Sequence, residues 1–129
     1  PRTIAPLTPH AAANGFKAAL IILEKWGCSN EQAWRILGMK HPTNSNIRDA
    51  TDQAVRLNDN QLVRVSYILN VHEALRVLFD NPDNIDGFMS MRNNNPYFGG
   101  RTPLEIISTG SLESLHEVFT RLDALIIQS

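Results

Sequence analysis

The chain has 129 residues, of which 43% are hydrophobic and 19% are charged, and its formal net charge is −1. This length suffices for one compact domain, or for two small subdomains that share a core. The composition is that of a folded protein rather than a disordered one. A net charge so close to zero argues against a protein that binds nucleic acid through its overall charge.

No part of the sequence looks like a membrane or export signal. The apolar runs fall short of the roughly 18 residues that a bilayer-crossing helix needs, and no segment has the pattern of a signal peptide. Cys28 is the only cysteine, which excludes an internal disulfide and a thiolate cluster for zinc. A small buried apolar residue is favoured over a reactive thiol at this position. We therefore expect a cytoplasmic protein with no membrane partner.

The charges are distributed unevenly along the chain. Residues 1–57 hold seven Lys or Arg and four Asp or Glu, whereas residues 58–129 hold five and nine. A basic first part and an acidic second part suggest two faces with different partners. Uneven surface charge without functional meaning is the alternative interpretation.

Two helices are predicted at the start of the chain. Thr8 and Pro9 form a cap and a first-turn proline, and the helix that follows should end at Gly27. Ser29 opens a second helix through a capping box and Gly38 ends it. The first helix has an apolar face at helical spacing, made of Phe16, Leu20, Leu23 and Trp26. Together the two segments predict a helical hairpin.

Three more helices are expected in the middle of the chain. A short third helix should span Thr43–Val55 after a polar turn. Asn58 is predicted to cap a fourth helix. Asn70 is a candidate for a left-handed residue, so we expect the fourth helix to end there and a fifth to continue to Phe79.

The last third of the chain should contain three further helices. Asn81-Pro82 begins the sixth, with Ile85, Phe88 and Met89 buried and Met91 as a further candidate. The seventh runs over Thr102–Thr109, where Thr102 and Glu105 form a capping box and Gly110 supplies a left-handed stop. The eighth begins at Ser111 and carries a heptad-like apolar seam of Leu112, Leu115, Phe119, Leu122 and Ile126.

These elements predict an all-α fold, a compact bundle of about eight short helices. We expect two units, one formed by residues 1–57 and the other by residues 58–129. The seam on the last helix is too short for a free coiled coil, so it packs on its own domain or on a second copy of the chain. A homodimer is therefore expected.

The sequence offers no arrangement for catalysis or metal binding. The four histidines lie in separate segments, and none stands at metal-ligand spacing from another His or Cys: His10, His41, His72 and His116. Acidic residues occur as like-charged pairs along helix faces, which is typical of solvated surface rather than of an acid–base pair. We expect neither an enzyme nor a metal site.

The first three helices have the order and size of a helix-turn-helix unit. In such a unit the helix after the turn lies in the major groove and presents polar side chains at its start. Asn can bind adenine, Arg can bind guanine, and Ser or Thr can bind phosphate. The candidate DNA-binding residues are Lys40, His41, Thr43, Asn44, Ser45, Asn46 and Arg48. A simple capped turn is the alternative interpretation of this segment.

The segment between the sixth and seventh helices carries two adjacent aromatic residues. Tyr97 and Phe98 precede two glycines and Arg101, and aromatic residues on a loop need a core or a partner to cover them. Aromatic and Arg side chains are typical of interface hot spots. Phe98 is expected to fold back on Leu104 and Ile107, which leaves Tyr97 as the better candidate for partner contact.

This segment also carries a recognisable motif. An Asn-Pro, a large residue and a Gly precede a Thr-Pro-Leu helix that a Thr-Gly closes; the matching residues are Asn95, Pro96, Gly99 or Gly100, Pro103, Leu104, Thr109 and Gly110. The motif resembles that of the toxin-binding domain of the Xre/MbcA/ParS antitoxin family. The likeness extends from about residue 16 to 127, and it is specific in the second half and loose in the first.

The resemblance implies a bacterial type II antitoxin that neutralises a RES-domain toxin, which consumes NAD, by direct binding. It also implies repression of its own operon through the helix-turn-helix, with operator DNA as a second partner. NAD would belong to the toxin, so no cofactor is expected here. On this interpretation residues 1–57 form a helix-turn-helix-like DNA-binding unit, and residues 58–129 form a helical toxin-binding and dimerisation unit. We predict that the toxin-binding residues are Asn95, Tyr97, Phe98, Arg101, Thr102 and Leu104. The alternative is a DNA-binding transcription regulator whose second half only mediates dimerisation.

Overall fold

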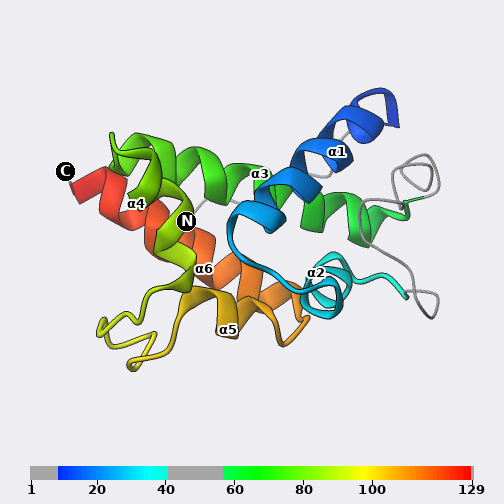
Figure 1. The fold of residues 1–129 in the computed structure, drawn as a ribbon. Helices are drawn as coiled ribbons and strands as arrows, with labels where there is room; N and C mark the ends of the chain where they lie inside the picture. The colour runs from blue at the N-terminus through cyan, green and yellow to red at the C-terminus, as the bar shows by residue number, and fades with distance from the viewer. Residues whose placement is uncertain (1–8, 41–56, 129) are drawn as a thin grey trace.

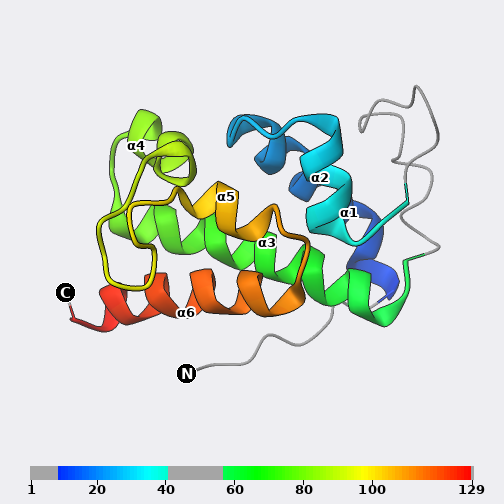
Figure 2. The ribbon, with the colours of Figure 1, turned by 90° about the horizontal axis from the view of Figure 1, so that it is seen from below.

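The fold is built around one long helix, α3 (Asp59–Leu78). The computed structural model describes residues 9–40 and 57–128. Within α3 every residue from Arg64 to Ile68 is buried. These consecutive buried residues span more than one turn of 3.6 residues, so this part of the helix is covered on all sides. Helices α6 (Leu112–Gln128) and α1 (Pro9–Lys25) pack most extensively against it. Figures 1 and 2 show α3 and α6 lying side by side and running in the same direction.

The two helices predicted at the start of the described chain are confirmed. Helix α1 ends before Gly27, whose φ of 84° is left-handed, and the Cys28 N–H donates to the Leu23 carbonyl over 3.1 Å. Helix α2 (Asn30–Leu37) has the complete capping box of Ser29 and Gln32. It ends at Gly38, with φ of 68°.

The predicted break at Asn70 is wrong. Helix α3 starts at the expected cap, Asn58, and continues without interruption to Leu78. The Asn70 amide donates to the Ser66 carbonyl over 2.7 Å, one turn earlier, so this side chain bonds along the helix rather than ending it. Val71, Ala74 and Leu75 beyond it are buried, and this packing holds the second part of the helix in place.

Short elements connect α3 to α6 along the chain. Helix α4 (Pro82–Gly87) is capped by Asn81 as predicted and passes into a 3-10 turn, η2 (Phe88–Ser90). Met89 is fully buried, but Met91 is 60% exposed, so its predicted burial is wrong. Helix α5 (Pro103–Ile107) begins at Thr102, which accepts a hydrogen bond from the Glu105 N–H, and Gly110 provides the left-handed stop with φ of 86°.

The all-α fold is confirmed, with six α-helices and one 3-10 turn among the described residues. The count is lower than the expected eight because two predicted helices are one, and because the predicted helix at Thr43–Val55 lies outside the described residues. The apolar seam of α6 packs against the core of the same chain. Leu115, Phe119 and Leu122 are buried in the core, with Leu112 and Ile126 packed against it.

Polar contacts join α2 and α3 to the turn between α5 and α6. The buried Arg64 of α3 donates to the carbonyls of Ile36 and Gly110, over 3.1 and 2.7 Å. The Gln32 amide donates to the Ser108 hydroxyl over 3.3 Å. One continuous core runs through α1, α2, α3, α5 and α6, and the division into units 1–57 and 58–129 stays a prediction.

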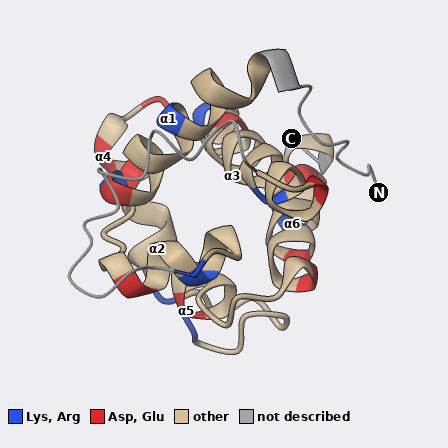
Figure 3. Ribbon diagram, turned by 90° about the vertical axis from the view of Figure 1, so that its right-hand side faces the viewer, with Lys and Arg blue, Asp and Glu red and all other residues tan. Residues whose placement is uncertain are grey.

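Charged residues of α4 and α6, apart from the buried Asp123, lie on the outside of the bundle (Figure 3). Ion pairs such as Arg76–Glu73 and Arg121–Glu117 connect residues within one helix. Among the described helices, none combines the length and the apolar character that crossing a membrane requires.

Candidate functional site

The candidate site is the loop of residues 93–102, which joins η2 to α5 and packs on α6. Two backbone hydrogen bonds close its base. The Asn93 N–H donates to the Arg101 carbonyl over 3.1 Å, and the Gly100 N–H donates to the Asn93 carbonyl over 2.9 Å. Gly99 and Gly100 have φ of 58° and 83°, a left-handed pair that non-glycine residues adopt only with strain. The loop therefore has a defined shape before any partner arrives.

Asparagine side chains hold the tip of the loop. The Asn95 N–H donates to Oδ1 of Asn93 over 2.8 Å, and the Tyr97 N–H donates to Oδ1 of Asn95 over 3.1 Å. These are Asx turns, in which a short side chain replaces a backbone acceptor. The Asn95 carbonyl accepts from the N–H groups of Phe98 and Gly99 as well. Asn95 thus organises the loop from both its side chain and its backbone.

Arg101 and Arg121 support Tyr97 from two sides. Arg101 donates from Nε to the Phe98 carbonyl over 2.9 Å and from Nη2 to the Tyr97 carbonyl over 3.1 Å. The guanidinium of Arg121, on α6, lies 4.8 Å from the centre of the Tyr97 ring, a cation–π contact. Burial, followed by the nearby Glu117, raises the pKa of the Tyr97 hydroxyl, so this group stays protonated at neutral pH and can donate a hydrogen bond.

Phe98 and Leu104 lie beneath this surface. Phe98 is 2% exposed and Leu104 is 8% exposed, and both belong to the core. The burial expected for Phe98 is confirmed, and so is the partial exposure expected for Tyr97. Because these two side chains are buried, they stabilise the loop and present little accessible surface to a partner. The cap oxygen of Thr102 already accepts the Glu105 N–H over 3.0 Å.

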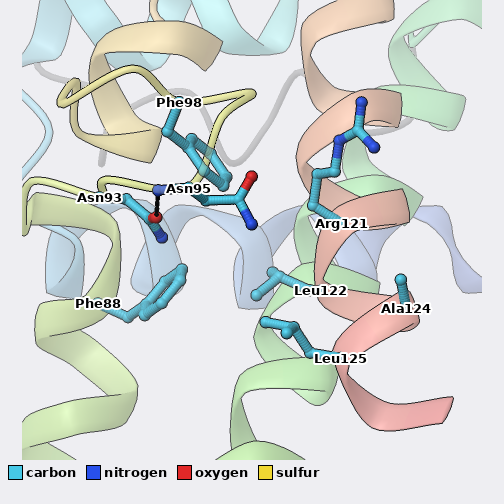
Figure 4. A pocket seen from close by; sticks show the side chains of 8 residues that line it. All are labelled: Phe88, Asn93, Asn95, Phe98, Arg121, Leu122, Ala124 and Leu125. Atoms are coloured by element: carbon cyan, nitrogen blue, oxygen red, sulfur yellow. Dashed lines mark hydrogen bonds between the residues drawn. The ribbon is translucent and has the colours of Figure 1, made fainter. Parts of the chain in front are cut away.

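A cleft of about 190 Å³ lies between the loop, η2 and the second half of α6 (Figure 4). We name it the loop–α6 cleft. Its lining combines five apolar side chains with polar groups of the loop and of α6: Phe88, Asn93, Asn95, Phe98, Arg121, Leu122, Ala124 and Leu125. The described structure therefore brings Asn95 and Phe98 together with α6 residues that the sequence analysis did not select.

The predicted DNA-binding residues are not gathered by the described structure. Lys40 is exposed just after α2. The other six lie outside the described residues: His41, Thr43, Asn44, Ser45, Asn46 and Arg48. A role in DNA binding stays a prediction for all seven.

The reactive groups of the described chain are dispersed. Burial raises the pKa of the Cys28 thiol to about 12, which keeps it protonated and a poor nucleophile at neutral pH. The His116 Nδ1 lies 2.7 Å from the Tyr67 hydroxyl, within hydrogen-bond distance. Within residues 9–40 and 57–128, no three His, Cys, Asp or Glu side chains gather as a metal site requires.

A comparison of sequences relates this site to a known class of domain. Residues 74–125 match the family model of the antitoxin Xre/MbcA/ParS C-terminal toxin-binding domain. The match runs from the last turn of α3 into α6 and contains the whole loop. It supports a role as the antitoxin of a toxin–antitoxin system. No curated protein matches the chain.

Sequence reasoning missed Asn93, Arg121 and Leu125 as parts of this surface. Asn93 had a local signal, since it opens a run of three asparagines before a proline, a pattern typical of side-chain-stabilised turns. Arg121 and Leu125 had none. They stand on a helix whose apolar seam faces the core, and only the packing of the loop brings them to the site.

Proposed function

We propose that this protein neutralises a RES-domain toxin that consumes NAD, by binding it through residues 93–102 and the adjoining face of α6. The observation that carries the proposal is the way in which Tyr97 is held inside the matched toxin-binding domain. Its aromatic ring is partly exposed on a rigid loop, Arg101 donates to its backbone carbonyl, and Arg121 contacts the ring. Preorganised aromatic and Arg side chains are typical of residues that dominate binding energy.

The predicted residues divide into two roles. Tyr97 and Arg101 are the contact residues, because their side chains are partly or fully exposed. Asn95 and Thr102 hold the loop and the start of α5 through hydrogen bonds, and Asn95 is also exposed to a partner. Phe98 and Leu104 anchor the same segment in the core. The toxin would then meet a surface whose shape depends on all six residues, although only some of them touch it.

We also propose that the first half of the chain represses the operon by binding operator DNA. The order of α1, α2 and the predicted helix at Thr43–Val55 supports this part of the proposal, with Lys40 and Arg48 as cationic contacts. A cytoplasmic homodimer fits the same role. The α6 seam gives a homodimer no support, since it is occupied by the core.

Co-expression with the product of a neighbouring RES-domain gene tests the main proposal. We expect the two proteins to co-purify, and we expect growth to recover from the arrest that the toxin alone causes. Tyr97→Ala should reduce both the co-purification and the recovery of growth. Val77→Ala also shortens an exposed side chain, but on α3, and it should reduce neither. Failure of the wild-type chain to bind or rescue would contradict the proposal.

A mobility-shift assay with the chain's own promoter at two salt concentrations tests the second part. We expect a shift that weakens steeply with salt, because phosphate contacts release counterions. Arg48→Ala should weaken it further. A promoter shift without toxin binding would instead favour a transcription regulator whose second half only dimerises.

A further inference from the structure

The polar lining of the loop–α6 cleft consists of hydrogen-bond donors. The Oδ1 atoms of Asn93 and Asn95 each accept a backbone N–H of the loop, over 2.8 and 3.1 Å. This fixes the orientation of both amides and turns their nitrogens toward the space beside Phe88 and Leu122 (Figure 4). Within the described chain neither NH₂ group has a hydrogen-bond partner. Each retains two N–H groups for a ligand.

The remaining lining is apolar. Phe88, Phe98, Leu122 and Leu125 form the walls, and Leu125 is 42% exposed where the cleft meets solvent. An apolar cavity of about 150 Å³ accommodates a benzene molecule. The loop–α6 cleft, at about 190 Å³, can therefore hold one aliphatic or aromatic side chain.

Arg121 adds a positive charge at the rim. Its guanidinium pairs with Glu117 over 3.5 Å, but both side chains are partly exposed, at 46% and 34%. Exposed pairs of this kind contribute little to stability, so a ligand can compete for the guanidinium at small cost. The cleft thus combines amide donors, a cation and an apolar wall, and each amide oxygen already accepts one backbone hydrogen bond.

We propose that the loop–α6 cleft receives an apolar side chain of the partner toxin together with a carboxylate beside it. A carboxylate is acceptor-only, which complements the NH₂ groups of Asn93 and Asn95 and the charge of Arg121. The apolar side chain displaces water from Phe88 and Leu125. The proposal rests on the proposed function, and it adds the chemistry of the toxin segment: an acidic residue adjacent to a large apolar one.

A peptide titration tests the cleft without the toxin. The probe is the acetylated and amidated peptide Gly-Leu-Glu-Gly, and the control peptide carries Gln in place of Glu. At about 10 mM, a concentration that reports dissociation constants in the millimolar range, the probe should shift the side-chain NH₂ resonances of Asn93 and Asn95. The Gln peptide should shift them much less. Equal shifts from both peptides, or none, would overturn the proposal.

A matched pair of variants tests the cleft in the complex. Asn95→Asp keeps an oxygen that accepts the Tyr97 N–H, but it replaces the NH₂ donors by a negative charge. Asn14→Asp makes the same charge change at an exposed residue of α1, outside both the loop and the cleft. We expect Asn95→Asp to weaken toxin binding about tenfold or more, as the loss of a hydrogen bond to a charged group does. Asn14→Asp should stay within about twofold.

The two proposals fail in different ways. If the toxin binds wild type and Asn95→Asp equally well, the cleft proposal is wrong and the antitoxin proposal stands. If no toxin binds the wild-type chain, the antitoxin proposal fails, and the peptide titration still decides whether the cleft takes an apolar–acidic ligand.

Discussion

The guanidinium of Arg121 lies 4.8 Å from the centre of the Tyr97 ring, and this contact joins the loop to α6. Phe98 meets the same ring edge-on, with 5.2 Å between the centroids. The buried phenylalanine and the helix cation together hold an aromatic side chain that would otherwise move freely on the surface. The position of Tyr97 is thus set by residues of both the loop and α6.

A double-mutant cycle measures this contact. Tyr97→Leu and Arg121→Gln should each lower the free energy of unfolding, and their effects should couple by about 0.5–1 kcal/mol, the range for exposed cation–π pairs. Urea denaturation of the wild type, both single variants and the double variant provides the four values. Strictly additive effects would mean that the contact contributes nothing.

Arg64 should be among the residues whose loss destabilises the fold most. Its buried side chain donates to the carbonyls of Ile36 and Gly110 and to Oδ1 of Asn60. Arg64→Met leaves the two carbonyls without this donor, and we expect a loss of about 3 kcal/mol. Arg76→Met, an exposed arginine of the same helix, serves as the control and should change stability by less than about 0.5 kcal/mol. Similar losses for the two variants would contradict the role assigned to Arg64.

Gly110 is required by its backbone conformation and by its neighbour. Its φ is 86°, and a Cβ atom there would lie 3.2 Å from the Arg35 carbonyl oxygen. Gly110→Ala should destabilise the fold by at least about 1–2 kcal/mol, the cost of a left-handed alanine. Gly87→Ala is the matched control, because its φ is −86° and the added methyl meets open space. Thermal unfolding of both variants checks the prediction, which fails if Gly110→Ala is as stable as the wild type.

Stability should decrease in acid because of His72. Burial lowers the pKa of His72 below 6.5, and Lys25 and Arg76 act in the same direction, while Asp86 and Glu73 oppose them. Below about pH 6.5 the unfolded chain therefore binds a proton that the native chain does not, so stability falls as the pH falls toward the native pKa.

His72→Gln isolates this contribution. Urea midpoints measured between about pH 7.5 and pH 5.5 should fall less in the variant than in the wild type. The other histidines are unchanged in both proteins, so their titration cancels in the comparison. If the urea midpoint depended on pH in the same way in the variant and the wild type, His72 would titrate alike in the folded and unfolded chains.

Local signals predicted much of this fold. Ser29, Asn58 and Thr102 each accept the backbone hydrogen bond expected of a cap, because capping depends on residues three apart in sequence. The reciprocal half of the box at Thr102 does not form among the described contacts, since Glu105 points to solvent. The same reasoning failed at Asn70, where a residue often found at helix ends bonds back to Ser66 inside a buried helix.

Long-range packing could not be predicted in the same way. Arg64 looks like a surface cation in the sequence, and its acceptors lie 28 and 46 residues away. The loop–α6 cleft likewise takes its lining from η2, the loop and α6. The motif placed Asn95 and Tyr97 in the site, but which residues of α6 face them depends on how the loop packs, and no local pattern encodes it.

Hydrogen–deuterium exchange with and without the RES-domain toxin tests most directly whether the loop and α6 form the toxin-binding surface. Binding should slow exchange at the backbone amides of residues 94–101 and of peptides covering Arg121 and Leu125, while α1 and α2 change little. Slower exchange confined to α1 and α2, with the loop unchanged, would contradict the account.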